Sequence, residues 1–202
     1  GRLGNSVALN GEGNIVAIGA SQNDENGTNT GEVKVYENIN GTWTQLGGDI
    51  NGVVDFEDSG YRVALSEVGD IVAISSASSN ANGLHSGHVR IFEYLGGVWT
   101  QIGEDINGEA SEDYFGWSMA LSASGNIIAI GSLWNDNNES DAGNVRIFQN
   151  LDGVWTQMGL NINGEAANDN SGFSVDISDD GNTVVIGAPG RSHPHALPDN
   201  NV

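Results

Sequence analysis

Gly4-Asn5-Ser6-Val7-Ala8-Leu9, followed by Gly13-Asn14-Ile15-Val16-Ala17-Ile18-Gly19, is the stretch that decides the fold, because it returns at a fixed interval along the chain. Successive copies lie 56 residues apart and open at Gly4, Gly60, Gly116 and Gly172. A Trp-Thr-Gln motif follows the same period, at Trp43, Trp99 and Trp155. A constant period predicts a repeat architecture, in which each unit buries its apolar face against the next one.

Each copy contains four short runs of β-forming residues separated by turn residues. In the first copy these runs are Ser6–Leu9, Ile15–Ile18, Val33–Tyr36 and Trp43–Leu46. Gly and Asn tolerate positive φ, so residues 10–14 predict a hairpin turn. The second run is apolar on both faces, which predicts a strand buried between two layers.

The same runs return in the later copies, with only the first two present in the last copy. They lie at 62–65, 71–74, 89–92 and 99–102, then at 118–121, 127–130, 145–148 and 155–158, and finally at 174–177 and 183–186. Four antiparallel strands per unit are typical of a β-propeller blade. The sequence therefore predicts an all-β propeller or partial propeller of about three and a half blades. A β-sandwich also contains many short strands, but it has no reason to repeat side chains at a strict spacing.

The repeats divide the chain at predictable points. Units span 4–59, 60–115 and 116–171, a partial unit spans 172–190, and residues 191–202 form a tail without the pattern, so that residues 1–190 make the repeat region. Three and a half blades do not close a ring. Either the chain is a piece of a larger ring, or a second chain supplies the missing strands. The sequence enters the repeat directly, without an initiator Met or a signal peptide, and this favours a piece of a longer protein.

Composition limits the possible partners. The chain has 27 acidic and six basic residues, a net charge of −21, and no cysteine. Nucleic acids and anionic membranes need clustered Lys and Arg, so neither is an expected partner. Disulfides, Cys-based zinc sites and Cys nucleophiles are excluded. No apolar run approaches the roughly 20 residues that span a bilayer, so we expect no membrane insertion.

These motifs resemble the FG-GAP repeat, in the variant found in bacterial secreted proteins and, distantly, in integrin α-subunit propellers. The resemblance covers residues 1–190 and is closest at Phe173-Ser174-Val175 with Gly187-Ala188-Pro189-Gly190. The segments Asn51-Gly52, Asn107-Gly108-Glu109 and Asn163-Gly164-Glu165 resemble the linkers between such repeats. Integrin-type repeats often carry an Asp-rich calcium loop between their first two strands, but the corresponding turns here lack the convergent oxygens that calcium needs.

The longer loop between the second and third runs is the better metal candidate. Asp24 and Asn26 in the first copy, and Asp136 and Asn138 in the third, have a spacing that can place two oxygens on one calcium ion. An Asx-rich turn, stabilised by its own bonds from side chain to backbone, is the competing interpretation.

Two further series of residues follow the period. Lys34, Arg90 and Arg146 are expected to pair with a carboxylate of a neighbouring strand, such as Asp49 or Asp105, although a basic ladder could also bind an anionic glycan. The tryptophans of the Trp-Thr-Gln motif are expected to pack between blades or at blade edges, with sugar stacking as the alternative.

Other aromatic residues fall outside the register of that motif and are interpreted as non-periodic loop residues. We therefore expect the ligand contacts among Tyr61, Tyr114, Trp117 and Trp134, with Phe115 nearby.

Catalysis is not expected. The four histidines are His85, His88, His193 and His195; the last two could hold a metal, but no carboxylate partner is fixed by spacing. The few arginines do not readily assemble a sialidase-type cluster.

The resemblance implies a non-catalytic, secreted module of a bacterial cell surface or extracellular space that binds or adheres to a protein or a glycan. The alternatives are a structural unit that joins copies of itself edge to edge into a ring or filament, and a glycan-active enzyme.

Overall fold

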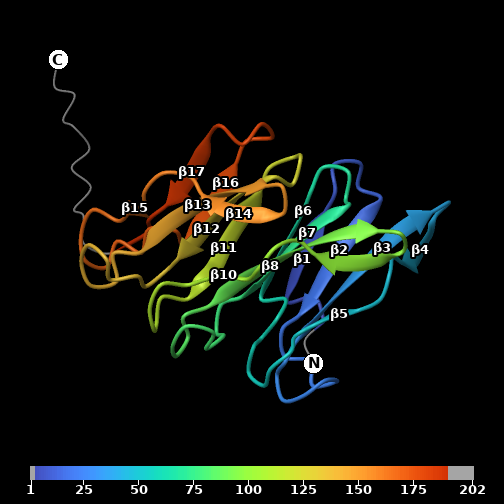
Figure 1. Cartoon of the computed structure of the whole chain (residues 1–202), viewed down its shortest axis with the longest axis horizontal. Helices are drawn as coiled ribbons and strands as arrows, with labels where there is room; N and C mark the ends of the chain where they lie inside the picture. The colour runs from blue at the N-terminus through green and yellow to red at the C-terminus, as the bar shows by residue number, and fades with distance from the viewer. Residues whose placement is uncertain (1–2, 191–202) are drawn as a thin grey trace.

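The computed structural model describes residues 3–190, which form antiparallel β-sheets connected by turns and loops (Figure 1). The expected tail lies outside these residues, as do His193 and His195. None of the described residues belongs to a helix that could cross a bilayer.

Each complete blade is one sheet with the same order of strands. The first contains β1 (Ser6–Leu9), β2 (Ile15–Ala20), β3 (Glu32–Ile39), β4 (Thr42–Gln45) and β5 (Ile50–Asn51). Strands β1 to β4 are hydrogen-bonded in chain order, and β5 also pairs with β3. The predicted bounds of the first strand are confirmed, and the second and third strands extend beyond the predicted runs.

The later blades repeat this order. The second contains β6 (Arg62–Leu65), β7 (Ile71–Ser76), β8 (His88–Leu95), β9 (Val98–Gln101) and β10 (Ile106–Asn107). The third contains β11 (Phe115–Leu121), β12 (Ile127–Ser132), β13 (Asn144–Leu151), β14 (Val154–Gln157) and β15 (Ile162–Asn163). Only β16 (Ser174–Ile177) and β17 (Val184–Gly187) follow in the described residues, so the prediction of three and a half blades is confirmed.

The outermost strand of each blade is interrupted, a feature that the sequence analysis did not predict. Gln45 of β4 lies opposite Tyr36, whereas Ile50 of β5 lies opposite Val33. Four residues of the outer strand therefore face only two residues of β3. Gly47 lies in this bulge with a φ of 75°, a conformation that favours glycine.

Apolar side chains of neighbouring sheets form the core. Ile15, Ala17 and Val33 of the first blade cluster with Val72 and Phe92 of the second. An equivalent cluster joins the second and third blades. Strands β7 and β12 are buried along almost their whole length, as expected for strands between two layers. Figure 1 shows the sheets side by side, from the N-terminal blade at the right to β16 and β17 at the left.

The Asn-Gly linkers lie close against the backbone of the blade that they leave, just before its third strand. The Gly108 N–H donates to the Gly87 carbonyl at 2.9 Å. A Cβ at Gly108 would lie 1.9 Å from the Ser86 carbonyl oxygen, and one at Gly52 would lie equally close to the Thr30 carbonyl oxygen. Only glycine fits where the linker crosses this backbone.

Candidate functional site

The innermost strands of successive blades, β1, β6, β11 and β16, lie beside one another. The glycine that opens each repeat lies at or just before the start of its inner strand, and the residue after this glycine is Asn5, Tyr61, Trp117 or Phe173 in the four repeats. The Asn5 amide donates to the Tyr61 carbonyl at 3.1 Å. The ring centroids of Tyr61 and Trp117 are 5.6 Å apart, and those of Trp117 and Phe173 are 6.4 Å apart. The interpretation of Tyr61 and Trp117 as non-periodic was wrong, because they occupy equivalent positions one period apart.

Tyr114 and Trp134 complete the cluster from two loops. The Tyr114 ring lies 4.7 Å from that of Trp134 and 6.5 Å from that of Trp117, and the two indoles are 6.3 Å apart. The structure thus brings together all four aromatic residues that were expected to contact ligand, and it adds Phe173. We call Tyr61, Tyr114, Trp117, Trp134 and Phe173 the aromatic patch. Phe115 is not part of it, because its side chain is fully buried against Phe148.

Tyr114 of the patch and His85 beside it adopt unusual backbone conformations. Tyr114 has a φ of 52°, and the equivalent positions of the neighbouring repeats hold Asp58 and Asn170, residue types that tolerate the left-handed region. His85 has a φ of 50°, and its equivalents are Asn29 and Asp141. Aromatic rings therefore replace the usual Asx residues at two adjoining points. A bulky residue held in this region costs free energy, and such positions cluster at functional sites.

Polar groups border the patch. His85 Nδ1 lies 2.9 Å from the Tyr114 hydroxyl and 3.0 Å from Glu112 Oε2. The Arg62 guanidinium lies 4.7 Å from the centre of the Tyr61 ring. Burial raises the pKa of the Tyr61 and Tyr114 hydroxyls above their ordinary value, with Asp58 and Glu112 respectively adding to the rise, so both phenols are neutral at physiological pH. Burial also raises the pKa of Asp58, although Ser78 and His85 offset part of this effect.

The patch is a packed surface. Its rings contact one another at the distances given above, so they leave no room for a ligand between them. Trp134 and Phe173 are 39% and 49% exposed, and the other three rings are half-buried. This arrangement suits a ligand that lies across the rings and forms hydrogen bonds with the bordering groups.

The two aspartates of the predicted metal loops accept hydrogen bonds from the backbone of their own loops. Asp24 Oδ1 accepts the Asn29 N–H at 2.7 Å, and Asp136 Oδ1 accepts the Asp141 N–H at 2.7 Å. The Asn138 amide donates to the Gly164 carbonyl at 2.9 Å, whereas Asn26 lies exposed in its loop. The bonds of Asp24 and Asp136 run from side chain to backbone within their own loops, as the competing Asx-turn interpretation expects.

The basic series follows the prediction only in the first blade. Lys34 Nζ lies 3.1 Å from Asp49 Oδ2, as expected. Arg90 instead contacts Glu57, which stands in the linker between the blades, and His88 Nε2 lies 3.3 Å from the same carboxylate. Asp105, the predicted partner, accepts a hydrogen bond from Gln101 at 2.8 Å.

Arg146 also reaches across a blade interface. It donates to the Asn107 carbonyl at 2.6 Å and lies 3.9 Å from Glu109. The arginines join two blades because their long side chains reach the preceding linker.

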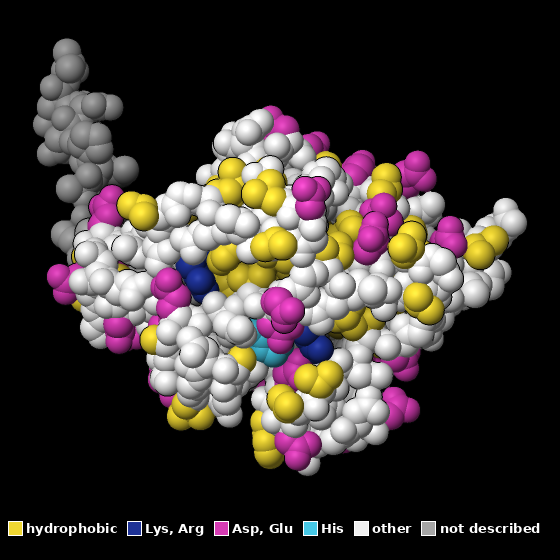
Figure 2. Space-filling view, in the orientation of Figure 1, with side chains coloured by type: hydrophobic (Ala, Val, Ile, Leu, Met, Phe, Trp, Pro, Cys, Tyr) yellow, Lys and Arg dark blue, Asp and Glu magenta, His cyan; other side chains and the backbone are white. Residues whose placement is uncertain are grey.

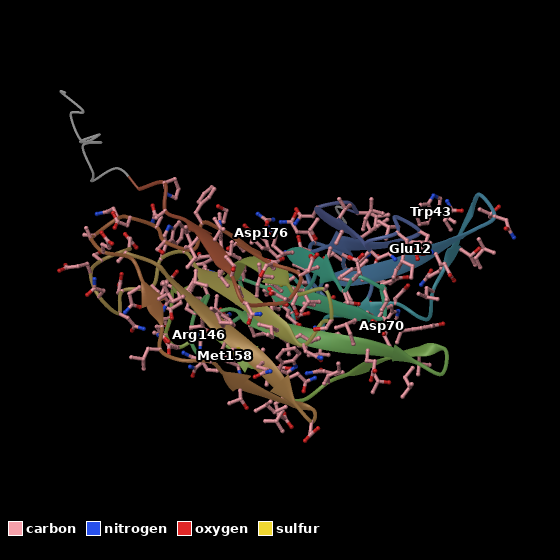
Figure 3. The ribbon with its side chains drawn as sticks, turned by 90° about the horizontal axis from the view of Figure 1, so that it is seen from above. Glu12, Trp43, Asp70, Arg146, Met158 and Asp176 are labelled. Atoms are coloured by element: carbon pink, nitrogen blue, oxygen red, sulfur yellow. The ribbon has the colours of Figure 1, made fainter. Side chains whose placement is uncertain are left out.

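The periodic tryptophans pack between blades, as predicted. The Trp99 indole donates to the Leu46 carbonyl at 2.8 Å, and the Trp155 indole donates to the Ile102 carbonyl at 3.1 Å. Trp43 differs, with 46% of its surface exposed, because no blade precedes the first blade in the described residues. Figure 3 places Trp43 at one end of the molecule, far from Arg146 and Met158 in the third blade.

Residues 107–148 match the FG-GAP repeat family, which confirms the resemblance in the third repeat. No curated protein matches the chain by sequence. Three similar solved structures are a protein assigned as a 6-phosphogluconolactonase from Bacteroides uniformis, a protein assigned as TolB from Agrobacterium tumefaciens, and a periplasmic gluconolactonase from Pseudomonas aeruginosa.

These structures are 13%, 13% and 12% identical to the chain, with TM-scores of 0.62, 0.50 and 0.54. The alignments cover 91%, 90% and 91% of this chain but only 49%, 52% and 50% of the other chains. The chain thus spans about half the length of these structures, and the similarity shows the fold alone.

Proposed function

We propose that this chain is a non-catalytic binding module of a bacterial extracellular or cell-surface protein, and that its ligand contacts the aromatic patch. The observation that carries this proposal is the convergence of five aromatic side chains at the ends of neighbouring inner strands. Exposed aromatic residues gathered in one place mark interaction sites, whereas aromatic residues scattered singly do not.

A neutral glycan fits the chemistry of the patch. The exposed ring faces offer an apolar surface for the C–H face of a sugar. Arg62, His85 and Glu112 supply donors and acceptors for its hydroxyl groups. Acidic side chains are spread over the face shown in Figure 2, and the net charge of −21 disfavours polyanionic ligands. A protein partner is the competing ligand.

An oligosaccharide array followed by calorimetric titration tests this proposal. Wild-type protein is expected to bind a neutral oligosaccharide without converting it. Trp117→Ala and Trp134→Ala should each weaken binding at least tenfold, whereas Trp43→Ala, which removes an exposed indole outside the patch, should not. Equal binding by wild type and both patch variants would refute the proposal. Binding of a protein, but of no glycan, through the same tryptophans would replace the glycan with a protein ligand.

Self-assembly is a second candidate function, favoured by the first blade. Val7 is 65% exposed, whereas its equivalent Val63 is 9% exposed beneath the first blade. Trp43 likewise lacks the cover that Trp99 has. This open face could receive a blade of another copy. A molecular mass that rises with protein concentration would support assembly, and a constant monomer mass would exclude it.

A further inference from the structure

Three acidic residues of the first repeat meet where its third strand begins, beside the interruption of the outer strand. They are Glu25 in the loop between β2 and β3, Glu32 at the start of β3, and Asp49 before β5. One carboxylate oxygen from each lies within 4.8 Å of the others. The equivalents are Ala81, His88 and Asp105 in the second blade, and Asn137, Asn144 and Asn161 in the third.

The third blade shows what this position can hold. The amides of Asn137 and Asn161 both donate to Glu109 Oε2 at 2.8 Å. The amide version of the position therefore binds a carboxylate. In the first blade, hydrogen-bond acceptors stand where the third blade has donors, because carboxylates replace the amides. The carboxylate that these amides bind is also missing, since Val53 stands at the position equivalent to Glu109. Carboxylates gathered at one position repel one another, so a bound cation would stabilise them.

Glu32 is the most buried member of this group, and the Asn23 amide donates to its Oε1 at 2.9 Å. Its side chain is only 5% exposed, and its Oε2 has no hydrogen-bond partner. Lys34 Nζ lies 3.6 Å from this oxygen and 3.1 Å from Asp49 Oδ2, so one ammonium faces three carboxylates. Burial raises the pKa of Glu32 despite the opposing effect of Lys34, and Asp49 and Glu25 raise it further.

We propose that Glu25, Glu32 and Asp49 bind a divalent cation of the calcium type. Carboxylate oxygens bind calcium at about 2.4 Å, so ligands on opposite sides of the ion lie up to about 4.8 Å apart, and the three oxygens of this group all lie within that distance of one another. Each carboxylate can supply one or two oxygens, and water completes the shell. Glu25 and Asp49 are exposed, which leaves the ion a path from solvent. The Lys34 ammonium competes with the ion for the same oxygens.

Calorimetric titration with calcium chloride tests this site independently of the glycan proposal. Wild-type protein should bind one calcium ion at this site. Glu25→Gln and Asp49→Asn, both at exposed positions, should each weaken binding at least tenfold. Lys34→Gln should tighten binding about tenfold, because it removes the competing cation. Asp105→Asn, the matched change in the second blade, should have no effect.

Loss of the signal in Asp49→Asn together with a gain in Lys34→Gln would establish the site. Undiminished binding by the Glu25→Gln/Asp49→Asn double variant would place the ion elsewhere on the acidic surface and overturn the proposal. The proposal also fails if neither the wild type nor Lys34→Gln binds calcium. Circular dichroism of each variant verifies that it is folded.

Discussion

Replacing Trp99 by alanine should destabilise the protein far more than the same change at Trp43. The two residues occupy equivalent positions. Of the two, only Trp99 has a preceding blade to pack against in the described residues. A Trp side chain that is about two-thirds buried withdraws on the order of 130 Å² from water, which at ~25 cal/mol per Å² amounts to ~3 kcal/mol. The bond to the Leu46 carbonyl adds ~1 kcal/mol. We therefore expect a loss of roughly 3–4 kcal/mol for Trp99→Ala.

Trp43→Ala should cost about 1 kcal/mol or less, because its indole has no preceding blade to pack against in the described residues and is 46% exposed. Urea unfolding followed by circular dichroism measures both values without relying on indole fluorescence. The experiment is done at low protein concentration, so that any contact between copies does not stabilise Trp43. Equal losses for the two variants would refute the argument that these tryptophans stabilise the protein by packing onto the preceding blade.

Two further changes test the linkers between blades. At neutral pH, Glu57→Gln should destabilise the fold by ~3 kcal/mol or more, because it leaves the buried Arg90 without its counter-charge. Burial acts to raise the pKa of Glu57, but His88, Arg90 and the Val53 N–H together lower it below 4.5, so its contribution is lost as the pH falls through the lowered value. Urea unfolding curves of wild type and variant should therefore converge in acid, and a constant difference down to pH ~2 would contradict this sign. Gly108→Ala should cost ~1–3 kcal/mol through its clash with the Ser86 carbonyl, whereas Gly48→Ala, where a Cβ meets nothing within 4 Å, should be nearly neutral in the same assay.

The repeat made most of the fold predictable. The fixed spacing shows which runs of successive repeats are equivalent. The alternation of apolar and turn residues then predicts the bounds of β1, β6 and β16 as the structure has them. The two-residue strands β5, β10 and β15 could not be predicted, because such short segments carry no periodicity of their own. They exist because the outer strand resumes its pairing with the third strand after a bulge.

The candidate site was only partly predictable. The sequence indicates the four aromatic residues, but the period that links Tyr61, Trp117 and Phe173 lies in a different register from the Trp-Thr-Gln motif. The signal for it is the residue that follows each opening glycine. The Arg90 contact with Glu57 could not be predicted, because the reach of a side chain across two sheets depends on how the blades pack. The convergence of Glu25, Glu32 and Asp49 likewise depends on the bulge before β5.

The indole N–H groups provide the most direct test of the aromatic patch as the ligand-binding surface. The chain has five tryptophans, each of which gives its own signal in a ¹H–¹⁵N correlation spectrum. Titration with a neutral oligosaccharide that binds the protein should shift the signals of Trp117 and Trp134 and leave those of Trp43, Trp99 and Trp155 unchanged. Saturation of the protein without a shift at Trp117 or Trp134 would contradict the proposed site.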